Sequence, residues 1–426
     1  MTPTEGTKKE TASLHYGYVV LLIGFLTVTG ALGFARFGYT TILPSMKTGL
    51  GLGNTEMGLL ATGNLAGYMF FSLLSGFLAS KYGPRVVIIF SMLLAGVTMF
   101  LTGLAGSIWA AFVFRALTGF GSAGSNIPMM GLVSAWFAPR CRGGATGFLV
   151  GGSGVALLVT GFLVPKVIAL WPQTGWRVSW FILGGLIIFL GTVSYPFLRN
   201  SPAEKGLAPI GSLPAGEPGC QTPGSNVAGG AADAQWKSVY GSRALWHIGV
   251  IYFTFGFSYI IYATFFSASL VTDKGLTQGE AGSMWATVGV ISIFSGILWG
   301  MLSDKIGRKH TLAIIFALES VCYALFALST SHTMLYVSVL LFGITCWSIP
   351  GVVAATCGDY VGARMAPAAL GMVTLFFGFG QALAPSVAGY TADLAASFTP
   401  AYLTAAVVAA LGALGSLTLR PPKYSK

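Results

Sequence analysis

Three charged residues lie inside long apolar stretches, where a charge is costly. Arg36 and Arg115 are cations, and Glu319 is an acid. A charge at the centre of a membrane span costs about 2.5–3.5 kcal/mol on insertion scales, so such a group faces a cavity or a partner and not lipid. A guanidinium binds a carboxylate through parallel hydrogen bonds, and a buried carboxyl group can carry a proton. These residue types therefore indicate anion binding, and they leave proton transfer open.

Arg36 is the main candidate for binding an anion. One fixed cation suits a monoanion such as a carboxylate better than a dianion. Two other roles stay open, namely an ion pair within the protein and a side chain that reaches the outer membrane surface. Arg36 lies 18 residues beyond Tyr18, or about 27 Å of helix. If the helix continues to Lys47, however, Arg36 falls in the outer-middle part of the span.

Acidic residues are scarce in the apolar stretches. Glu319 has three interpretations: a protonatable carboxyl group, the partner of a basic group, or a sign that a helix boundary is misplaced. Glu56 and Glu280 occupy matching positions, but residues 277–280 (TQGE) have the pattern of a capping box, so we expect both acids to cap helices. Glu319 is thus the candidate for proton coupling, and uniport and anion exchange remain alternatives.

Twelve apolar stretches must position these residues. Apolar residues make up 54% of the chain and charged residues only 8%. A stretch of about 20 apolar residues crosses a hydrocarbon core of about 30 Å. We therefore predict an all-α membrane protein, with spans near residues 17–42, 54–79, 86–106, 108–135, 143–170, 178–198, 245–271, 277–302, 310–329, 333–358, 366–391 and 400–418.

The basic residues are distributed unevenly between the predicted loops. A soluble protein with a net charge of +11 would suggest a nucleic-acid partner. With the N-terminus in the cytoplasm, however, 17 of the 23 Lys and Arg residues fall on the cytoplasmic side. Membrane proteins show this bias in their cytoplasmic loops. We predict a multi-pass protein with both termini in the cytoplasm and no nucleic-acid partner.

The chain contains an internal repeat. Residues 56–85 and 280–309 are two copies of one segment, 224 residues apart, in which Gly76 aligns with Gly300 and Gly83 with Gly307. A repeat of this length indicates two similar halves, and a two-fold repeat in an apolar chain is typical of transporters.

A polar segment joins the two halves. Between Pro202 and Trp236 the chain is rich in Gly, Pro, Ala and Ser, a composition that does not bury enough apolar surface to fold by itself. We therefore divide the chain into a cytoplasmic tail (1–16), an N-terminal six-helix bundle (17–200), a cytoplasmic linker (201–242), a C-terminal six-helix bundle (243–419) and a second cytoplasmic tail (420–426).

The repeated turns resemble a family motif. Residues 300–309 (GMLSDKIGRK) are similar to the loop motif Gly-x-Leu-x-Asp-x-x-Gly-Arg-Arg of the major facilitator superfamily, and residues 76–85 are a weaker copy with Ser80 in place of the acid. Residues 115–121 (RALTGFG) resemble its fourth-helix motif. The resemblance covers nearly the whole chain and implies two pseudo-symmetric six-helix bundles that rock around a cavity. For Arg115 it implies helix packing or a proton relay.

The turn motifs have the residue types of a conformational latch. Glycines let helices approach closely, an Asp accepts hydrogen bonds, and basic residues meet acids or helix C-termini. Alternatively, the basic residues only set the topology. The candidate gating residues are Gly76, Lys81, Gly83, Arg85, Gly300, Asp304, Gly307 and Arg308.

Other segments resemble a narrower branch of the superfamily. Residues 136–147 and 198–209 are similar to loops of bacterial monocarboxylate and oxalate/formate porters, although the arginine expected in their eighth span is missing here. The spacing from Arg36 to Pro44 resembles that of organophosphate/phosphate antiporters, in which this arginine binds the anion. Their seventh-helix arginine is also missing. The resemblance thus implies a cavity position for Arg36 and favours a monocarboxylate.

Polar and aromatic residues on the expected inner helices complete the candidate site. The resemblance places the first, second, fourth and fifth helices of each half around the cavity. An amide or phenol there can hydrogen-bond a carboxylate, although the same residues also pack helices together. Besides Arg36, the candidates are Tyr39, Asn64, Tyr68, Asn126, Tyr259, Tyr262, Trp285, Trp347 and Gln381.

The sequence has no motif for catalysis or for a cofactor. It contains no Walker loop, no nucleophile elbow, no metal-ligand cluster and no Cys-x-x-Cys pair. We predict a secondary transporter and not an enzyme, without metal or cofactor, that acts as a monomer in a bacterial inner membrane. Its partners are a small organic anion, the lipid bilayer and, if transport is coupled, a proton. The alternatives are an exporter of amphipathic drugs and a receptor that does not transport.

Overall fold

The computed structural model describes residues 15–212, 240–329 and 331–419, so the predicted tails and most of the predicted linker lie outside the described residues. The N-terminal half begins with α1 (Tyr16–Val28), the π-helix η1 (Thr29–Phe37) and α2 (Gly38–Leu50), which form one continuous helical segment. It continues with α3 (Asn54–Tyr82), α4 (Pro84–Leu104), α5 (Ile108–Trp136), α6 (Pro139–Leu170) and α7 (Gly175–Phe197). The C-terminal half contains α9 (Arg243–Thr272), α10 (Gln278–Ile306), α11 (Arg308–Leu328), α12 (His332–Thr345), α13 (Ser348–Ala395) and α14 (Thr399–Leu417).

Eleven helical segments of the described residues are long and apolar enough to cross a membrane. Helix α5 is also long enough, but its Gly, Ser, Thr and Asn residues and Arg115 make it less apolar. The label α13 covers parts of two spans, because the chain bends at Gly362, whose φ is 77°. The all-α fold of twelve membrane-length segments in two halves is therefore confirmed.

Several helices extend beyond the predicted apolar stretches. The first segment ends at Leu50 and not near residue 42, and it includes Pro44. A helix satisfies its own backbone hydrogen bonds, so it can continue past the last apolar residue. Hydropathy therefore located the spans better than their ends.

Local sequence signals end and begin the helices. Gly83 and Gly307 follow α3 and α10 with φ of 86°, a left-handed conformation that glycine adopts without a clash of Cβ. The predicted capping box is confirmed, because the backbone N–H of Thr277 donates to Glu280 Oε2 at 2.8 Å and the N–H of Glu280 donates to Thr277 Oγ1 at 3.2 Å. Glu56 Oε2 likewise accepts from the N–H of Gly53 at 2.7 Å.

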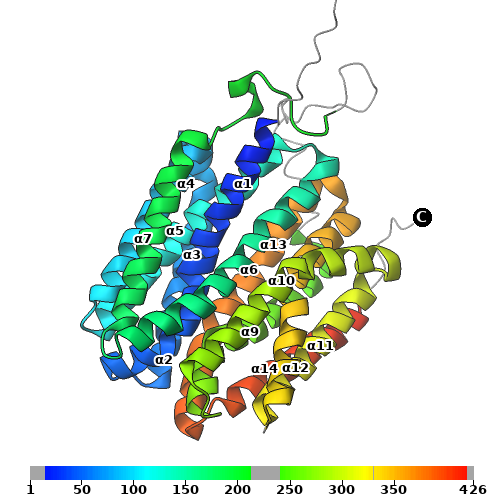
Figure 1. Cartoon of the computed structure of the whole chain (residues 1–426). Helices are drawn as coiled ribbons and strands as arrows, with labels where there is room; N and C mark the ends of the chain where they lie inside the picture. The colour runs from blue at the N-terminus through cyan, green and yellow to red at the C-terminus, as the bar shows by residue number, and fades with distance from the viewer. Residues whose placement is uncertain (1–14, 213–239, 330, 420–426) are drawn as a thin grey trace, which may run out of the picture.

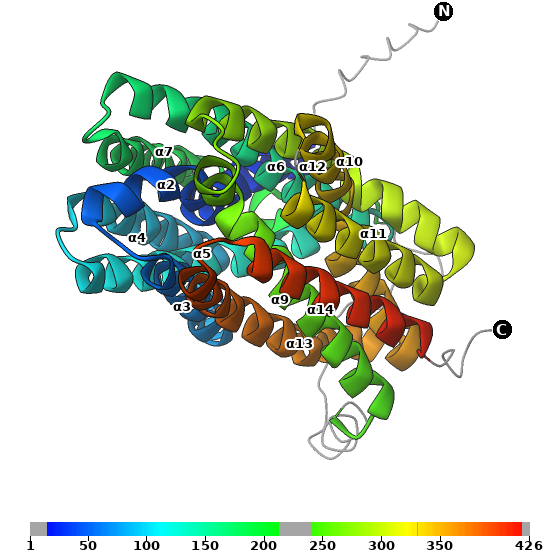
Figure 2. The same ribbon diagram turned by 90° about the horizontal axis from the view of Figure 1, so that it is seen from below.

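The two halves lie side by side (Figures 1 and 2), with the N-terminal half coloured blue to green and the C-terminal half yellow-green to red. Three helix pairs make most of the contacts between them: α2 with α9, α3 with α13, and α6 with α10. The candidate site lies at this boundary.

Residues 198–212 cover one end of the N-terminal half, at the top of Figure 1. They include the short 3-10 helix η2 (Pro202–Lys205) and an isolated bridge between Ile210 and Phe137. At the same end, the hydroxyl of Tyr16 donates to the carbonyl of Phe197 at 2.8 Å. We call this the linker end of the molecule and the opposite end the far end.

Candidate functional site

Arg36 lies near the middle of the first helical segment, within the π-helix η1. π-helical turns often mark functional sites, because they break the regular ladder of backbone hydrogen bonds. The side chain is half-buried, and its Nη2 donates to the hydroxyl of Tyr259 at 2.9 Å. Tyr259 belongs to α9, so this hydrogen bond joins the two halves.

The guanidinium of Arg36 has no acidic partner among the described residues. Its Nε is buried and makes no hydrogen bond. The rings of Phe37 and Tyr68 lie 5.5 and 5.8 Å from its central carbon, distances at which an aromatic ring attracts a cation. Arg36 thus faces the boundary between the halves and keeps donors free for another acceptor.

A small cavity, with room for only about one water molecule, adjoins Arg36. Its walls come from both halves, and it contains the second arginine that the sequence places in an apolar stretch. The lining residues are Arg36, Phe37, Tyr39, Thr40, Ala61, Asn64, Leu65, Arg115, Ile260, Ala263 and Thr264.

Arg115 reaches this cavity from α5 and is 1% exposed. Its Nη1 donates to the carbonyl of Ala35, the residue before Arg36, at 2.8 Å. Its central carbon lies 4.8 Å from the ring centre of Tyr39 and 5.1 Å from that of Trp180. Nε makes no hydrogen bond. Arg115 therefore contacts the backbone that carries Arg36 and still has unused donors.

Four of the predicted site residues in the N-terminal half lie in or beside the cavity. Tyr39 and Asn64 line it, where the hydroxyl of Tyr39 donates to the carbonyl of Met57 and Asn64 Nδ2 donates to the carbonyl of Arg115. Tyr68 places its ring beside Arg36, and Asn126 Nδ2 donates to the Tyr68 hydroxyl at 3.0 Å.

The predicted site residues of the C-terminal half divide into two groups. Tyr259 bonds Arg36, and the ring of Trp347 lies 5.3 Å from that of Phe37, next to Arg36 in the chain. Tyr262 instead bonds Ser338 inside the C-terminal half. Trp285 packs against Phe266, and Gln381 is buried on α13; neither lines the cavity.

Seven of the lining residues are not among those predicted from the sequence. Five of them, Phe37, Ala61, Leu65, Ile260 and Ala263, are apolar and resemble any other residue of a span. Thr40 and Thr264 are polar, and Thr40 follows Arg36 by one helical turn, a spacing that would have indicated it. Its hydroxyl donates to the carbonyl of Ala263 at 2.5 Å, another contact between the halves.

Glu319 lies on α11, away from the cavity lining, and is 0% exposed. Neither carboxyl oxygen has a hydrogen-bond partner, and the two ion pairs of the described residues do not include it. Tyr323, Cys322 and Cys346 lie near it. An ionised carboxylate is too costly in such surroundings, so we expect the carboxyl group to be protonated here.

The hydrogen bonds that join the two halves lie between the cavity and the far end. Every hydrogen bond between the halves in the described residues involves an N-terminal residue from Arg36 to Thr62. The most extended contact is Asp393 of α13, which accepts from the backbone N–H groups of Asn54 and Thr55 at 2.8 and 2.7 Å. Asp393 thereby caps the first turn of α3 from the other half.

Close glycine contacts also lie toward the far end. The Cβ that would be added at Gly161 of α6 lies 2.7 Å from the backbone nitrogen of Ala286 on α10. Nearer the linker end of the same helices, Gly147 and Gly300 have no heavy atom within 4 Å of that position. The structure is therefore closed at the far end, with space around the glycines toward the linker end.

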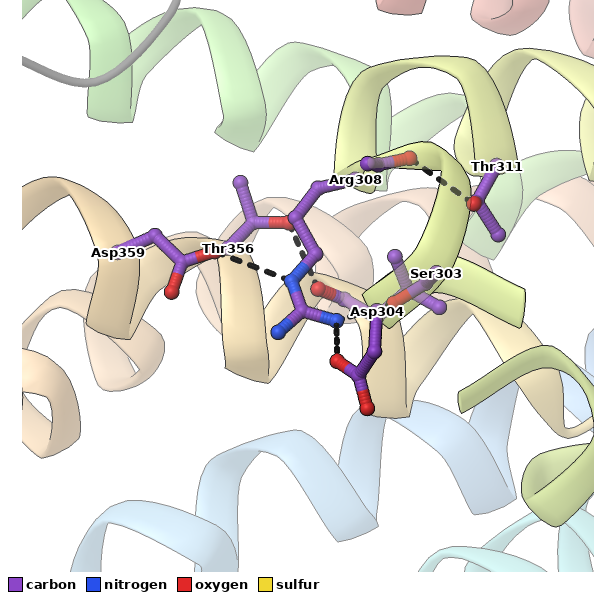
Figure 3. A network of polar contacts seen from close by, with 8 residues as sticks. Ser303, Asp304, Arg308, Thr311, Thr356 and Asp359 are labelled. Carbon is purple, nitrogen blue, oxygen red and sulfur yellow. Dashed lines mark hydrogen bonds and ion pairs between the residues drawn. The ribbon is translucent and has the colours of Figure 1, made fainter. Parts of the chain in front are cut away.

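Both turn motifs make their contacts within their own half. Figure 3 shows Arg308 between Asp304 and Asp359. Its Nη1 lies 2.5 Å from Asp304 Oδ1 and its Nε lies 3.0 Å from Asp359 Oδ2, and all three residues belong to the C-terminal half. Arg308 also bonds the hydroxyl of Ser303. This cluster ties the α10–α11 turn to α13.

The N-terminal copy of the turn motif is held in place without an acidic residue. Arg85 Nε donates to the carbonyl of Tyr195 at 2.9 Å, and its guanidinium lies 4.2 Å from the ring centre of the same residue. Lys81 lies over the ring of Tyr82, and Gly76, like Gly300, has open space where a Cβ would lie. Within the described residues, neither motif makes a hydrogen bond to the other half in this state.

The fold and cavity define a membrane transporter built from two helical bundles. The sequence model of the Major Facilitator Superfamily matches residues 25–271, and a model described as the uncharacterised MFS-type transporter YbfB matches residues 220–417. The chain belongs to the Major Facilitator Superfamily. Its family and relatives are transporters and not enzymes. No group of three His, Cys, Asp or Glu residues in the described ranges is arranged to hold a metal ion.

Several curated relatives are named as transporters of organic acids. The chain is 25% identical to the probable sulfoacetate transporter SauU of Cupriavidus necator, over 91% of this chain and 90% of the relative. It is 26% identical to human monocarboxylate transporter 2 over 79% and 72%, and 25% identical to the probable L-galactonate transporter of Escherichia coli over 94% and 88%.

Solved structures share the fold. A bacterial homologue of the human lysosomal transporter Spinster, in an inward-facing and unoccupied conformation, superposes with a TM-score of 0.73 at 17% identity, over 96% of this chain and 98% of that one. The nucleoside transporter NupG superposes with a TM-score of 0.72 at 14% identity, over 97% and 100%.

Proposed function

We propose that this protein is a secondary transporter that moves a small organic anion bearing a carboxylate, by alternating access of a cavity between its halves. The observation that carries the proposal is the guanidinium of Arg36, which faces that boundary, has no acidic partner in the described residues and retains a buried Nε without a hydrogen bond. A partly buried cation without a counter-ion is costly unless an anion neutralises it. The names of several relatives, which are organic-acid transporters, support the same class of cargo.

The proposed location is a bacterial inner membrane, with both termini in the cytoplasm. The excess of basic residues in the loops on that side supports this orientation. With the termini in the cytoplasm, the far end faces outward, and the closed contacts there correspond to an inward-facing state. The rocking of the halves would break the far-end contacts and bring the linker ends together. We expect one chain to be sufficient, because the cavity is formed within it.

We expect a monocarboxylate because Arg36 is the one cation that the sequence assigns to anion binding. Arg36 alone would neutralise one negative charge. The human relative named monocarboxylate transporter 2 supports this class. The two relatives named as putative tartrate transporters instead support acids with more than one carboxyl group.

Proton coupling is the second part of the proposal, with Glu319 as the acid that carries the proton. Its support is complete burial without a basic partner. Such a carboxyl group releases its proton only if its surroundings change between access states. In liposomes, an inward-directed proton gradient should then stimulate uptake. Glu319→Gln should remove that stimulation and keep exchange of labelled for unlabelled anion. Uptake by the unmodified chain that ignores the gradient would favour uniport or anion exchange.

The transport proposal is tested by uptake of labelled carboxylates into liposomes that contain the purified full chain. Arg36→Ala should lower saturable uptake at least tenfold, and Arg36→Lys should restore it only in part, because Lys has no planar pair of donors. Movement of a lipophilic cation with no response to carboxylates would instead support a drug exporter. Binding without flux would support a receptor.

A further inference from the structure

We propose that Arg115 is a second anion-binding group in the cavity and that the cargo therefore carries two acidic groups, as a short dicarboxylate or a carboxylate with a second acid such as a sulfonate does. This inference rests on the proposed transport of an organic anion and makes its substrate class narrower. It begins from the position of Arg115, which lines the same cavity as Arg36 although the two residues come from different helices.

Arg115 has more hydrogen-bond donors than the described residues around it offer acceptors. A guanidinium has five N–H groups, and the only hydrogen bond of this side chain in the described residues is Nη1 to the carbonyl of Ala35. Its Nε is buried without a partner, as is the Nε of Arg36. A purely structural arginine at 1% exposure would be expected to use most of its donors.

The charges in the cavity are also unbalanced. The lining contains two guanidinium groups and no carboxylate, and the ion pairs of the described residues include neither arginine. Like charges repel strongly where water is scarce. A bound monoanion would neutralise one of the two cations and leave the other without a counter-charge. An anion with two negative groups would neutralise both.

The remaining lining favours a small ligand with an apolar middle part. In this state the cavity has room for only about one water molecule, so it favours a short ligand over a bulky one. Ala61, Leu65 and Ile260 provide apolar surface between the polar groups. A short hydrocarbon with an acid at each end therefore matches the cavity better than a long or bulky acid.

Arg115 could instead act only by holding the backbone of η1 in place through Ala35, as a positioning residue. The two roles are separable. Arg115→Gln keeps a side-chain donor for the Ala35 carbonyl but removes the charge, whereas Arg115→Lys keeps the charge. A positioning role predicts equal losses for all anions, while a binding role predicts a loss only for anions with a second acidic group.

The experiment compares the binding of matched ligand pairs to the purified full chain, by calorimetry near pH 7.5. The pairs are oxalate and oxamate, malonate and malonamate, succinate and succinamate, and tartrate and tartramate, in which each second member replaces one acid with a neutral amide. The full chain should bind at least one dianion about tenfold or more tightly than its monoamide, the loss expected for one charge-assisted contact. Arg115→Gln should remove this preference by weakening the dianion alone, and Arg115→Lys should keep most of it.

Two results would overturn the proposal. One is equal binding of every dianion and its monoamide by the unmodified chain, which decides the matter even if the variants do not fold. The other is an equal loss for both members of a pair in Arg115→Gln, which would leave a positioning role only. If the unmodified chain binds neither member of any pair and transports no carboxylate, the transport proposal itself fails, which is a different outcome.

Discussion

At the scale of single residues, Arg36 and Tyr259 join the two halves beside the cavity through one hydrogen bond. Arg36 is conspicuous because it is a charge within an apolar stretch. Tyr259 is not, because aromatic residues are common in α9. The structure shows that Tyr259 is the C-terminal hydrogen-bond partner of Arg36, and that Tyr262, three residues later, belongs to an internal contact with Ser338.

This pair of tyrosines gives a direct test of the site. We expect Tyr259→Phe to raise the KM for anion uptake about tenfold, because it removes a hydrogen bond to a charged group, which is worth about 1.5–3 kcal/mol. Tyr262→Phe removes the same hydroxyl from the same helix outside the cavity and should leave KM within about twofold. Uptake kinetics in liposomes measure both values. Equal effects of the two substitutions would show that Tyr259 has no special part in the site.

At the scale of elements, the far end is closed by helix termini as well as by packing. Asp393 of α13 caps α3 across the boundary between the halves. Asp273, just after α9, makes a similar cap within one half, where its Oδ2 accepts from the backbone N–H of Phe398 at 2.7 Å. The two acids make the same kind of contact, but only Asp393 joins parts that we expect to separate during transport.

We expect Asp393→Ala to shift the protein toward opening of the far end. Loss of a cap costs about 0.5–2 kcal/mol, or about 2–30-fold in the equilibrium between access states. Spin labels on cysteines introduced at exposed Thr48 and Gly279, in a chain without its native cysteines, would measure the separation of the halves there. The longer-distance population should grow in Asp393→Ala.

Asp273→Ala is the matched control for this measurement. It should lower thermal stability to a similar degree and leave the distance distribution unchanged, because its partner lies in the same half. A similar shift in both variants would mean that the change reflects general loosening of the protein and not a contact specific to one access state.

At the scale of the whole molecule, glycines along α6 and α10 fall into two sets. Gly161 and Gly282 meet closely toward the far end, whereas Gly147 and Gly300 have open space at the positions of an added Cβ. If the halves rock about the cavity, the second set should come into contact in the opposite access state.

We therefore expect Gly147→Leu and Gly300→Leu to lower transport at least tenfold while the anion still binds, since the present state has room for the larger side chain and the opposite state does not. Uptake and ligand-induced thermal shift, measured on the same preparations, would separate the two effects. Gly185→Leu is the control, because Gly185 on α7 is exposed and also has open space around it. Normal uptake by both variants would contradict close approach of these helices.

The sequence alone determined the class of fold, because hydropathy and helix ends depend on residues near one another in the chain. The apolar stretches predicted the twelve spans, residues 277–280 predicted a cap that is present, and the turn motifs placed the chain in its superfamily. It also identified Arg36, because a charge in an apolar stretch is visible without any partner.

Only the tertiary structure decided which side chains meet. Arg115 is 79 residues from Arg36, and its position in the same cavity depends on how α5 packs against η1. The choice between Tyr259 and Tyr262 and the closure of the far end likewise depend on contacts between the halves. Nothing in the spacing of residues along one helix fixes its rotation toward another helix, and the two sets of glycines permit close packing at either end. The arrangement of the cavity and the access state are therefore properties of the packed molecule.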